Sequence, residues 1–275
     1  MNKPKISVLV PTYNRPKLLH RTLDSIIKQS YPGEIEAIVV NDAGEYPILK
    51  AKGIELDYIK HYSDMNGLRK VKYIENKKNK GLAGTRNVAI KASTGDYIVL
   101  LDDDDIFLPY ALEFRMYMME KLNAEIVYTR ALWDIWEKKD NTYVSVHKQL
   151  YWDSIFDKDL ILVQNIAPCC CPLFSRKAWD DSDNYLFDEK MTTTEDHDFF
   201  IALSRKTDFK ELKLVDCECS YRKDKTQMTG RDNFLPNWII TFKKWRHTAR
   251  DLNWVKEHQN NILMKAGVNP EDYGL

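Results

Sequence analysis

The first hundred residues alternate short runs of β-branched apolar residues with segments in which apolar residues recur every three to four positions. The runs at residues 6–10, 35–40 and 97–101 predict buried strands, and residues 15–27 and 81–93 predict helices. Strands that alternate with helices in this way are typical of a parallel sheet covered by helices. The pattern therefore predicts an α/β fold, in which ligands bind at the carboxyl ends of the strands.

The remaining segments are less regular, and apolar spacing and turn residues predict each of them separately. The expected strands lie at residues 56–60, 71–74 and 125–129, with a hairpin at 133–151 and helices at 110–122, from 194 and from 233 onward. Asn14 and Thr194 are residue types favoured at helix N-caps, so we expect them to begin the helices that follow. Since the chain has no internal repeat and no Gly/Ser-rich linker, its parts are expected to form one compact unit.

The composition narrows the class of protein. The 275 residues are 44% hydrophobic and 30% charged, which is ordinary for a globular protein and excludes fibrous and globally disordered classes. Its 41 basic and 41 acidic residues balance, so net charge provides no general attraction to nucleic acid or to an anionic membrane. No apolar run approaches the roughly 18 residues of a membrane span, and the run at residues 6–10 is too short for a signal peptide. We therefore expect a cytoplasmic protein.

Five cysteines occur as a triplet at residues 169–171 and as a pair at Cys217 and Cys219. An odd number without CxxC spacing indicates neither a regular disulfide framework nor a common zinc motif. Reduced thiols are the preferred interpretation. A soft metal bound between the triplet and the pair stays open as the alternative, although no nearby histidine completes a familiar spacing.

Four consecutive aspartates, Asp102 to Asp105, follow the predicted strand at residues 97–101. In an extended segment their side chains would alternate between opposite sides. Like charges roughly 6 Å apart repel by about 3 kcal/mol at an effective dielectric near 20, so a compensating cation is expected. All-oxygen ligation suits Mg²⁺ or Mn²⁺. A solvated turn in which Asp105 caps the next helix is the alternative.

A second acidic group, Glu195, Asp196 and Asp198, follows the expected helix start at Thr194. Carboxylates in a first helical turn gain about 0.3–1 kcal/mol from the helix dipole, which alone could explain them. One of them could instead lie at the edge of a cleft and act as a general base. The residues by themselves leave both interpretations open.

Small, amide and basic residues surround the predicted helix start at residue 81, namely Asn79, Gly81, Gly84, Arg86 and Asn87. Glycines permit close backbone approach, free N–H groups at a helix start favour an anion, and Arg86 could bind a phosphate through two N–H groups. Neither GxxxxGK[ST] nor GxGxxG is present, so the group indicates anion binding without a P-loop or a dinucleotide fingerprint.

Five motifs in order carry a resemblance to a known family. They are VPTYNR (10–15), VVND (39–42), NKGLAGTRN (79–87), GDYIVLLDDDD (95–105) and TEDHDF (194–199). Together they resemble the family 2 glycosyltransferases of the GT-A fold, over roughly residues 5–225. The resemblance implies a Rossmann-like nucleotide-binding half (1–105) merged with an acceptor half (106–230), and a helical extension (231–275). The activity implied is inverting sugar transfer, with UDP-sugar favoured as donor.

For the nucleoside, the resemblance implies that Pro11, Tyr13 and Arg15 flank it. Asp42 would bond the base. Asn41 stands where the family more often has Asp, which leaves the base preference open.

For the diphosphate and catalysis, the resemblance implies that Arg86 lies near the phosphates and that Asp103 belongs to the donor site. Asp104 would ligate Mn²⁺ or Mg²⁺ directly, and Asp102 would contact the ribose or a metal-bound water. Asp196 would be the catalytic base that takes the proton of the acceptor hydroxyl. Asp224 replaces the usual His of the family's YRxH motif, so a metal or phosphate contact there is open.

The partners implied are a nucleoside diphosphate sugar and a glycan, lipid-linked or other hydroxyl acceptor, in surface polysaccharide or other glycoconjugate synthesis. Residues 238–255 carry aromatic and apolar residues at helical spacing, with basic residues among them. This segment is expected to pack on the domain. Peripheral contact with the inner face of the membrane is the alternative, and nucleic acid is a weaker one.

Other functions compete with sugar transfer. A nucleotidyltransferase of similar fold is disfavoured because the expected Gly-rich loop after the first strand is absent. A glycoside hydrolase could also use paired carboxylates, but without a nucleotide. A non-catalytic protein that binds nucleotide sugars is the third alternative, and Glu195 and Asp196 argue against it.

Overall fold

The computed structural model describes residues 3–51, 54–64, 67–140, 142–150, 154–222 and 234–275. The strands are β1 (Ile6–Thr12), β2 (Ile35–Asn41), β3 (Leu49–Ala51), β4 (Ile54–Leu56), β5 (Arg69–Glu75), β6 (Tyr97–Leu100), β7 (Ile106–Phe107), β8 (Ile126–Lys139), β9 (Thr142–Leu150), β10 (Pro172–Ser175) and β11 (Lys210–Arg222). The α-helices are α1 (Pro16–Ile27), α2 (Tyr58–Ser63), α3 (Gly81–Ala92), α4 (Ala111–Leu122), α5 (Arg176–Asp181), α6 (Glu195–Lys206), α7 (Phe234–Trp245) and α8 (Leu252–Lys265).

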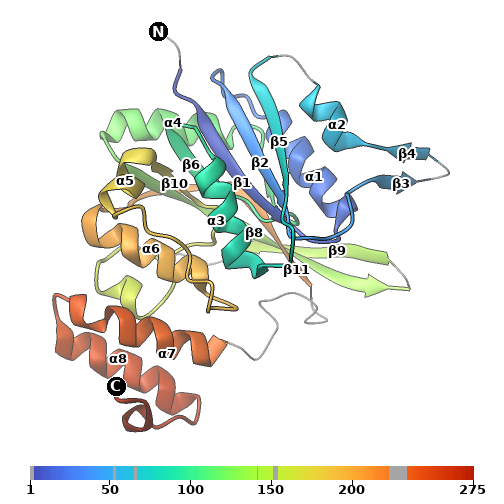
Figure 1. Cartoon of the computed structure of the whole chain (residues 1–275). Coiled ribbons are helices and arrows are strands. Elements are labelled where there is room, and N and C mark those ends of the chain that lie inside the picture. Colours follow the sequence, from blue (N-terminus) through green and yellow to red (C-terminus); the bar gives the residue numbers. More distant parts are fainter. Residues whose placement is uncertain (1–2, 52–53, 65–66, 141, 151–153, 223–233) are drawn as a thin grey trace.

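A mixed nine-stranded sheet forms the centre of the molecule, in the order β5-β2-β1-β6-β10-β8-β11-β7, with β9 paired to β8 (Figure 1). β1 pairs in parallel with β2 and β6, and β2 pairs in parallel with β5. β10 then lies antiparallel between β6 and β8 and joins the parallel half to the second half. The predicted α/β fold is confirmed, and the two expected halves share one sheet.

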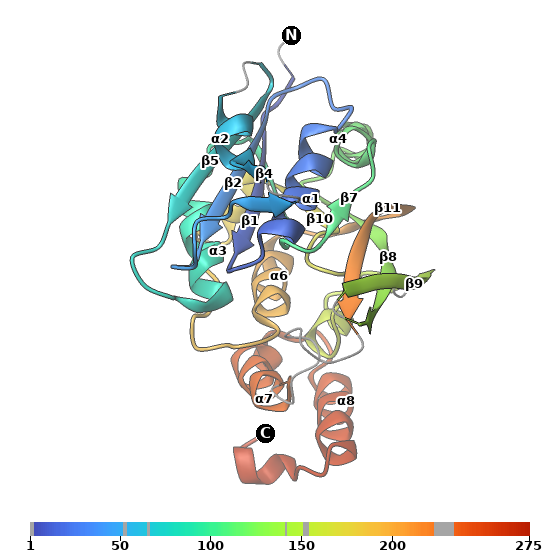
Figure 2. The same cartoon turned by 90° about the vertical axis from the view of Figure 1, so that its right-hand side faces the viewer.

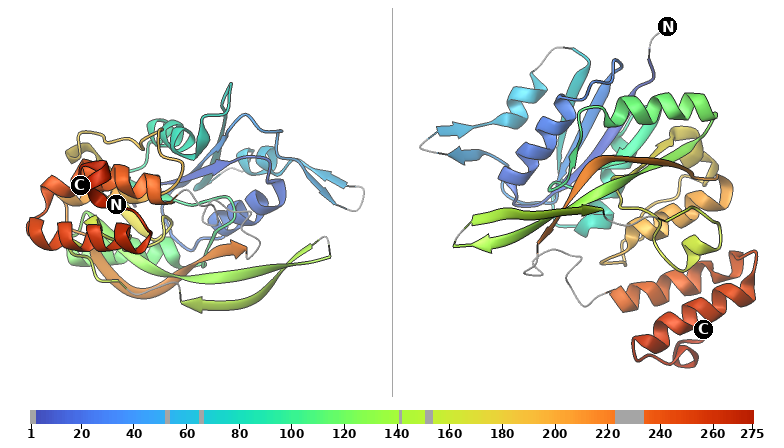
Figure 3. Two further views of the ribbon diagram at one scale, coloured as in Figure 1. Left: turned by 90° about the horizontal axis from the view of Figure 1, so that it is seen from below. Right: turned by 180° about the vertical axis from the view of Figure 1, so that it is seen from behind.

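Helices cover both faces of this sheet. Helices α3, α5 and α6 lie on one face, and α1 and α4 lie on the other (Figures 1 and 3). Every residue of β1 and β2 is therefore buried, which explains why both sequences are mostly apolar. A second sheet, β3 with β4, lies beside the main one.

Two local predictions in the first half are wrong. The strand expected at residues 56–60 is mostly helix α2, because the Asp57 side chain accepts a hydrogen bond from the backbone N–H of Lys60 and caps that helix. Asn14 does not cap α1, which begins at Pro16 without a side-chain cap. Its backbone has φ +54°, and its Oδ1 instead accepts the N–H of Glu45, which ties the turn after β1 to the turn after β2.

The strand expected at 125–129 and the hairpin expected at 133–151 form one structure. β8 continues to Lys139 and turns back as β9, and a register shift between Ile135 and Trp136 bends the ladder. β11 runs parallel to β8 almost to the same end. The β8–β9 hairpin extends beyond the helices (Figures 2 and 3).

The C-terminal segment folds as α7 and α8, which pack at the end of the molecule beside α6 (Figure 2). Val255 joins the main core and Phe242 anchors a smaller apolar cluster, as expected for a segment that packs on the domain. Three of its basic side chains have polar partners within the protein: Lys244 pairs with Asp188 and Asp198, Arg246 with Gln259 and Asn260, and Arg250 with Asp157. The predicted boundary between residues 230 and 231 lies outside the described residues, and so does Asp224.

None of the helices in the described part of the chain is both long and apolar enough to cross a membrane. Cytoplasmic location and membrane contact both stay predictions.

Candidate active site

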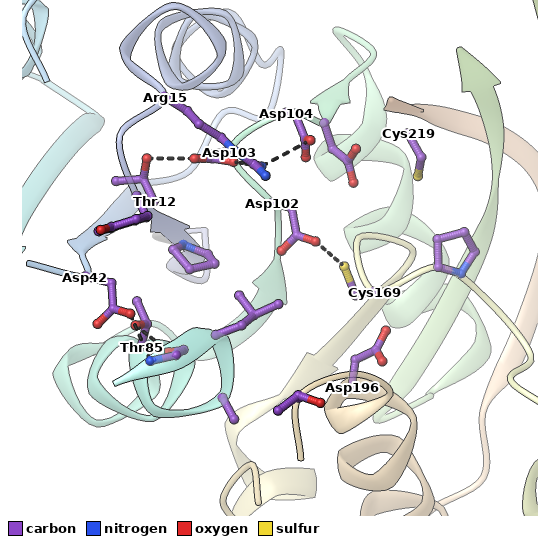
Figure 4. Close-up of a pocket in the computed structure, with 18 of the residues that line it drawn as sticks. Thr12, Arg15, Asp42, Thr85, Asp102, Asp103, Asp104, Cys169, Asp196 and Cys219 are labelled. Atoms are coloured by element: carbon purple, nitrogen blue, oxygen red, sulfur yellow. Dashed lines mark hydrogen bonds and ion pairs between the residues drawn. The ribbon is translucent and has the colours of Figure 1, made fainter. Parts of the chain in front are cut away.

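A cavity of about 700 Å³ lies where β1, β2 and β6 end and where α3 and α6 begin. All but one of the site residues expected from the sequence line it, namely Pro11, Tyr13, Arg15, Asp42, Asp102, Asp103, Asp104 and Asp196. In the view of Figure 4, Asp42 and Thr85 lie on one side of the pocket and Cys169 and Asp196 on the other, with Asp102 between them. The exception is Arg86, which is not part of the cavity wall.

Asp42 links the end of β2 to the start of α3. Its Oδ1 accepts the backbone N–H of Lys80 at 2.8 Å, and its Oδ2 accepts that of Gly81 at 2.9 Å. The carboxylate thus satisfies N–H groups at the helix start, and Oδ1 of Asn79 also accepts the N–H of Gly81, at 3.2 Å. Gly81 has φ +74°, a conformation that favours glycine, and this explains the glycine at the helix start. The bond of Asp42 to a base stays a prediction.

The aspartates form a turn and do not continue the strand. The N–H of Asp105 donates to the carbonyl of Asp102 at 3.1 Å, so the expected alternation of side chains is wrong. Asp103 and Asp104 both accept hydrogen bonds from Nη1 of Arg15, at 3.0 and 3.3 Å. The Thr12 hydroxyl donates to the second oxygen of Asp103 at 2.7 Å.

Arginines provide much of the positive charge that this acidic turn requires. Arg222, at the end of β11, donates to Oδ2 of Asp104 at 2.9 Å. Burial raises the pKa of Asp103 to about 7, although Arg15 opposes this shift. Burial and the neighbouring Asp104 raise the pKa of Asp105 well above its usual range. Asp105 accepts the N–H of Ser220 and does not cap a helix.

Arg86 is 1% exposed and lies beneath the cavity. Its Nη2 donates to Oδ1 of Asp102 at 2.7 Å, and its Nη1 donates to Oε1 of Glu195 at 2.5 Å. The guanidinium therefore joins α3 to the aspartate turn and to the first residue of α6. In this structure it contacts two acidic side chains, and the position near the diphosphate that the resemblance implied stays a prediction.

Asp196 reaches the cavity from the first turn of α6. Thr194 precedes the helix at φ +60°, but its side chain does not cap it, because its buried Oγ1 has no hydrogen-bond partner among the described residues. Instead, Oδ1 of Asp196 accepts the N–H of His197 at 2.8 Å. The adjacent Glu195 is fully buried, and burial raises its pKa to about 7. Of the two carboxylates, only Asp196 lines the cavity and can receive a proton from a ligand there.

The site also contains residues outside the set of donor-binding, metal and catalytic residues predicted from the sequence. Cys169 lies against Asp102, with 3.5 Å between the sulfur and Oδ2. Trp133 and Tyr221 line the cavity with their rings stacked at 4.9 Å. Arg222 lies two residues before Asp224, in the segment compared with the family's YRxH motif, and its basic charge there was the available signal. Nothing in the local pattern marked Cys169 or Thr12 as neighbours of the aspartates.

The mixed sheet, and a carboxylate-lined cavity at the ends of its parallel strands, define a domain of the GT-A type. A crystal structure of Staphylococcus aureus TarS residues 1–349 in complex with UDP-GlcNAc has the same fold, with a TM-score of 0.69 and 17% identity. The match covers 94% of this chain and 71% of that chain.

The family model for glycosyl transferase family 2 matches residues 7–182, and the chain belongs to this family. The putative glycosyltransferase EpsE of Bacillus subtilis is 38% identical over 118 residues, which cover 43% of this chain and 39% of EpsE. The uncharacterized glycosyltransferase YwdF of Bacillus subtilis is 31% identical over 215 residues, which cover 78% of this chain and 72% of YwdF. The chain thus spans well under half of EpsE and most of YwdF.

Proposed function

We propose that this protein transfers a sugar from a nucleoside diphosphate sugar to an acceptor hydroxyl, with inversion at the anomeric carbon. The observation that carries the proposal is that Asp196 and the aspartate turn at residues 102–104 line one cavity. One carboxylate can accept a proton there while the others lie at the donor-binding end of the sheet. Membership of family 2 supports sugar transfer as the reaction class.

In the proposed reaction the acceptor oxygen attacks the anomeric carbon from the face opposite the diphosphate. A new carbon–oxygen bond forms as the bond to the diphosphate oxygen breaks, and the nucleoside diphosphate leaves. Asp196 takes the acceptor proton as general base. Its carboxylate is held by the N–H of His197, which leaves the second oxygen available to the acceptor. Since one displacement occurs, the configuration inverts.

The residues present fit a divalent cation. Asp104 and the partly exposed Asp102 offer carboxylate oxygens on the cavity wall, a donor set that suits Mn²⁺ or Mg²⁺ with phosphate oxygens. When bound, the ion would neutralise charge on the departing diphosphate. The carboxylate of Asp104 would then contact the ion as well as the side chains of Arg15 and Arg222, with which it already forms ion pairs.

A UDP-sugar is the proposed donor. The fold likeness to TarS, whose structures were solved with UDP and with UDP-GlcNAc, supports this choice. Tyr13, half exposed at the cavity, and Pro11 would flank the nucleoside, and Asp42 would bond its base. For the acceptor we propose a glycan or lipid-linked hydroxyl compound, because the stacked Trp133 and Tyr221 offer aromatic surface in the cavity wall.

The test compares wild-type protein with Asp196→Asn and with Asp180→Asn, a control aspartate exposed on α5. Thermal shifts with UDP, Mn²⁺, Mg²⁺ and EDTA would measure donor binding, and UDP release from a panel of UDP-sugars with glycan acceptors would measure transfer. We expect a metal-dependent shift in all three proteins and UDP release that Asp196→Asn lacks.

Each alternative gives a different result. Binding of UDP-sugar by the wild type without turnover across the panel would favour a non-catalytic binding protein. Formation of UTP and sugar 1-phosphate when pyrophosphate is added to a UDP-sugar would indicate a nucleotidyltransferase. Full transfer by Asp196→Asn would refute the assigned base.

A further inference from the structure

Four buried thiols meet behind the active-site cavity. Cys170 and Cys171 precede β10, and Cys217 and Cys219 lie on β11, nearly fifty residues further along the chain. The sulfur of Cys170 is 3.4 Å from that of Cys219 and 3.5 Å from that of Cys217, and the sulfurs of Cys171 and Cys217 are 3.5 Å apart. All are free cysteines. The catalytic proposal uses none of them.

Three of these thiols are arranged as ligands of one ion would be. The sulfurs of Cys170, Cys171 and Cys217 all lie within 4.8 Å of one another, and the three residues are fully buried. In a tetrahedral site with metal–sulfur bonds of about 2.3 Å, neighbouring sulfurs are about 3.8 Å apart. Shifts of a few tenths of an ångström would bring the Cys170–Cys217 and Cys171–Cys217 pairs, each at 3.5 Å, to that spacing. Thiolates are the ligands that zinc and softer ions prefer.

A buried arginine holds the two cysteine-bearing segments together. Nη1 of Arg115 donates to the carbonyl of Cys170 at 2.7 Å. Its Nε and Nη2 both donate, at 2.6 Å, to the carboxylate of Asp216, the residue before Cys217. One fully buried guanidinium thus fixes both segments, so the relative positions of the thiols do not depend on packing alone.

The cluster is also connected to the cavity. Cys219 lines the cavity and contacts Cys170, which in turn contacts Cys217. Asp105 lies within 4.8 Å of the ligand atoms of Cys170 and Cys219. An ion that enters the cavity therefore meets an acidic and a sulfur ligand first and the buried thiols behind them.

We propose that Cys170, Cys171 and Cys217 bind one thiophilic divalent ion of the zinc class, which enters past Cys219. Each ligating thiol releases its proton to solvent as its bond to the ion forms. Cys219, in contact with Cys170, is the nearest further sulfur. This site is distinct from the proposed Mn²⁺ or Mg²⁺ site, whose ligands are oxygens.

Cadmium is a suitable probe, since its bonds to thiolates give an ultraviolet charge-transfer absorption that carboxylate ligands do not give. The full chain is reduced, freed of metal, checked for five thiols after denaturation, and titrated with Cd²⁺ and then with Zn²⁺. We expect one Cd²⁺ per chain with thiolate absorption, which Zn²⁺ displaces. Cys171→Ser should weaken binding at least about 100-fold. Cys169→Ser is the matched control, because it removes a neighbouring thiol outside the proposed set and should leave binding unchanged.

The wild-type spectrum does not depend on whether a variant folds, and circular dichroism checks the folding of each variant. Reduced, folded wild type without thiolate absorption would overturn the proposal, and so would equal Cd²⁺ affinity in Cys171→Ser. Loss of the absorption in Cys169→Ser alone would place the ion beside Asp102 and would also overturn it. If protein isolated without reductant has fewer than five free thiols, and if the reduced protein binds no metal, the cluster is a disulfide site and the proposal is overturned.

Discussion

Arg86 allows a sharp test because the structure and the family resemblance assign it different roles. Its guanidinium is buried and bonds Glu195 at 2.5 Å and Asp102 at 2.7 Å. Charges about 4 Å apart attract by about 4 kcal/mol at an effective dielectric near 20. Removing one partner of a buried pair leaves the other charge uncompensated and typically costs about 3–5 kcal/mol. We therefore expect Arg86→Met to lower the free energy of unfolding by that amount.

The assay is urea unfolding followed by circular dichroism, at pH 6 and pH 8. The double variant Arg86→Met with Glu195→Gln should recover much of the loss, because no charge is then left buried at position 195. The loss in Arg86→Met should be larger at pH 8, since Glu195, whose pKa burial raises to about 7, is then more fully ionised. Arg250→Met is the control, because its pair with Asp157 is exposed and should contribute about 0–1 kcal/mol.

The same variants separate the two roles in function. If Arg86 only positions Asp102 and Glu195, Arg86→Lys should lower kcat while UDP affinity stays within about threefold, which is below 1 kcal/mol. A direct phosphate contact would instead weaken UDP binding tenfold or more. Our reasoning is refuted if Arg86→Met unfolds no more easily than Arg250→Met, or if the double variant recovers nothing.

Three further predictions concern Asp103, Lys244 and Gly81. Burial raises the pKa of Asp103 in the folded state to about 7, whereas in the unfolded chain it is about 3.9. The free energy of unfolding should therefore fall as the pH rises from about 4 to about 7, by at most about 1.4 kcal/mol per pH unit. Asp103→Asn should flatten that slope in urea unfolding at pH 5, 6 and 7. Lys244→Met removes a cation from the fully buried Asp198. It should lower the free energy of unfolding by about 1–3 kcal/mol in urea unfolding, and it should reduce sugar transfer as measured by UDP release. Gly81→Ala forces a side chain into φ +74° and should cost about 1–2 kcal/mol in the same unfolding assay.

Each of these predictions has a matched comparison. An unchanged pH slope in Asp103→Asn would contradict the raised pKa. Lys243→Met, at the neighbouring position, should be close to neutral, and equal effects at positions 243 and 244 would contradict the role given to the ion pair. An unfolding free energy for Gly81→Ala within 0.5 kcal/mol of wild type, about the limit for surface changes, would contradict the backbone argument.

Local patterns in the sequence were sufficient to predict the α/β fold and most residues that line the cavity. Parallel strands buried on both faces are mostly apolar, so β1, β2 and β6 could be found as short apolar runs in the sequence. Their carboxyl ends meet at one edge of the sheet, so the polar residues after them, such as Asp42 and Asp102, had to lie near one another. Asp196 was identified through the order of the motifs, and it does reach the same cavity.

The tertiary structure decided what depends on contacts between distant segments. The sequence indicated Arg86 as a phosphate ligand, which stays a prediction. Its partner Glu195 is more than a hundred residues away, so only the folded structure reveals that pair. Residues 58–60 form part of helix α2 and not the expected strand, because the side chain of Asp57 accepts the backbone N–H of Lys60 and caps the helix. The four cysteines of the cluster have no familiar spacing in the sequence. They lie near β10 and on β11, which are separated in the sheet by β8, and the buried Arg115 links the two segments. Local patterns report which face of an element is buried, but not which side chain it meets there.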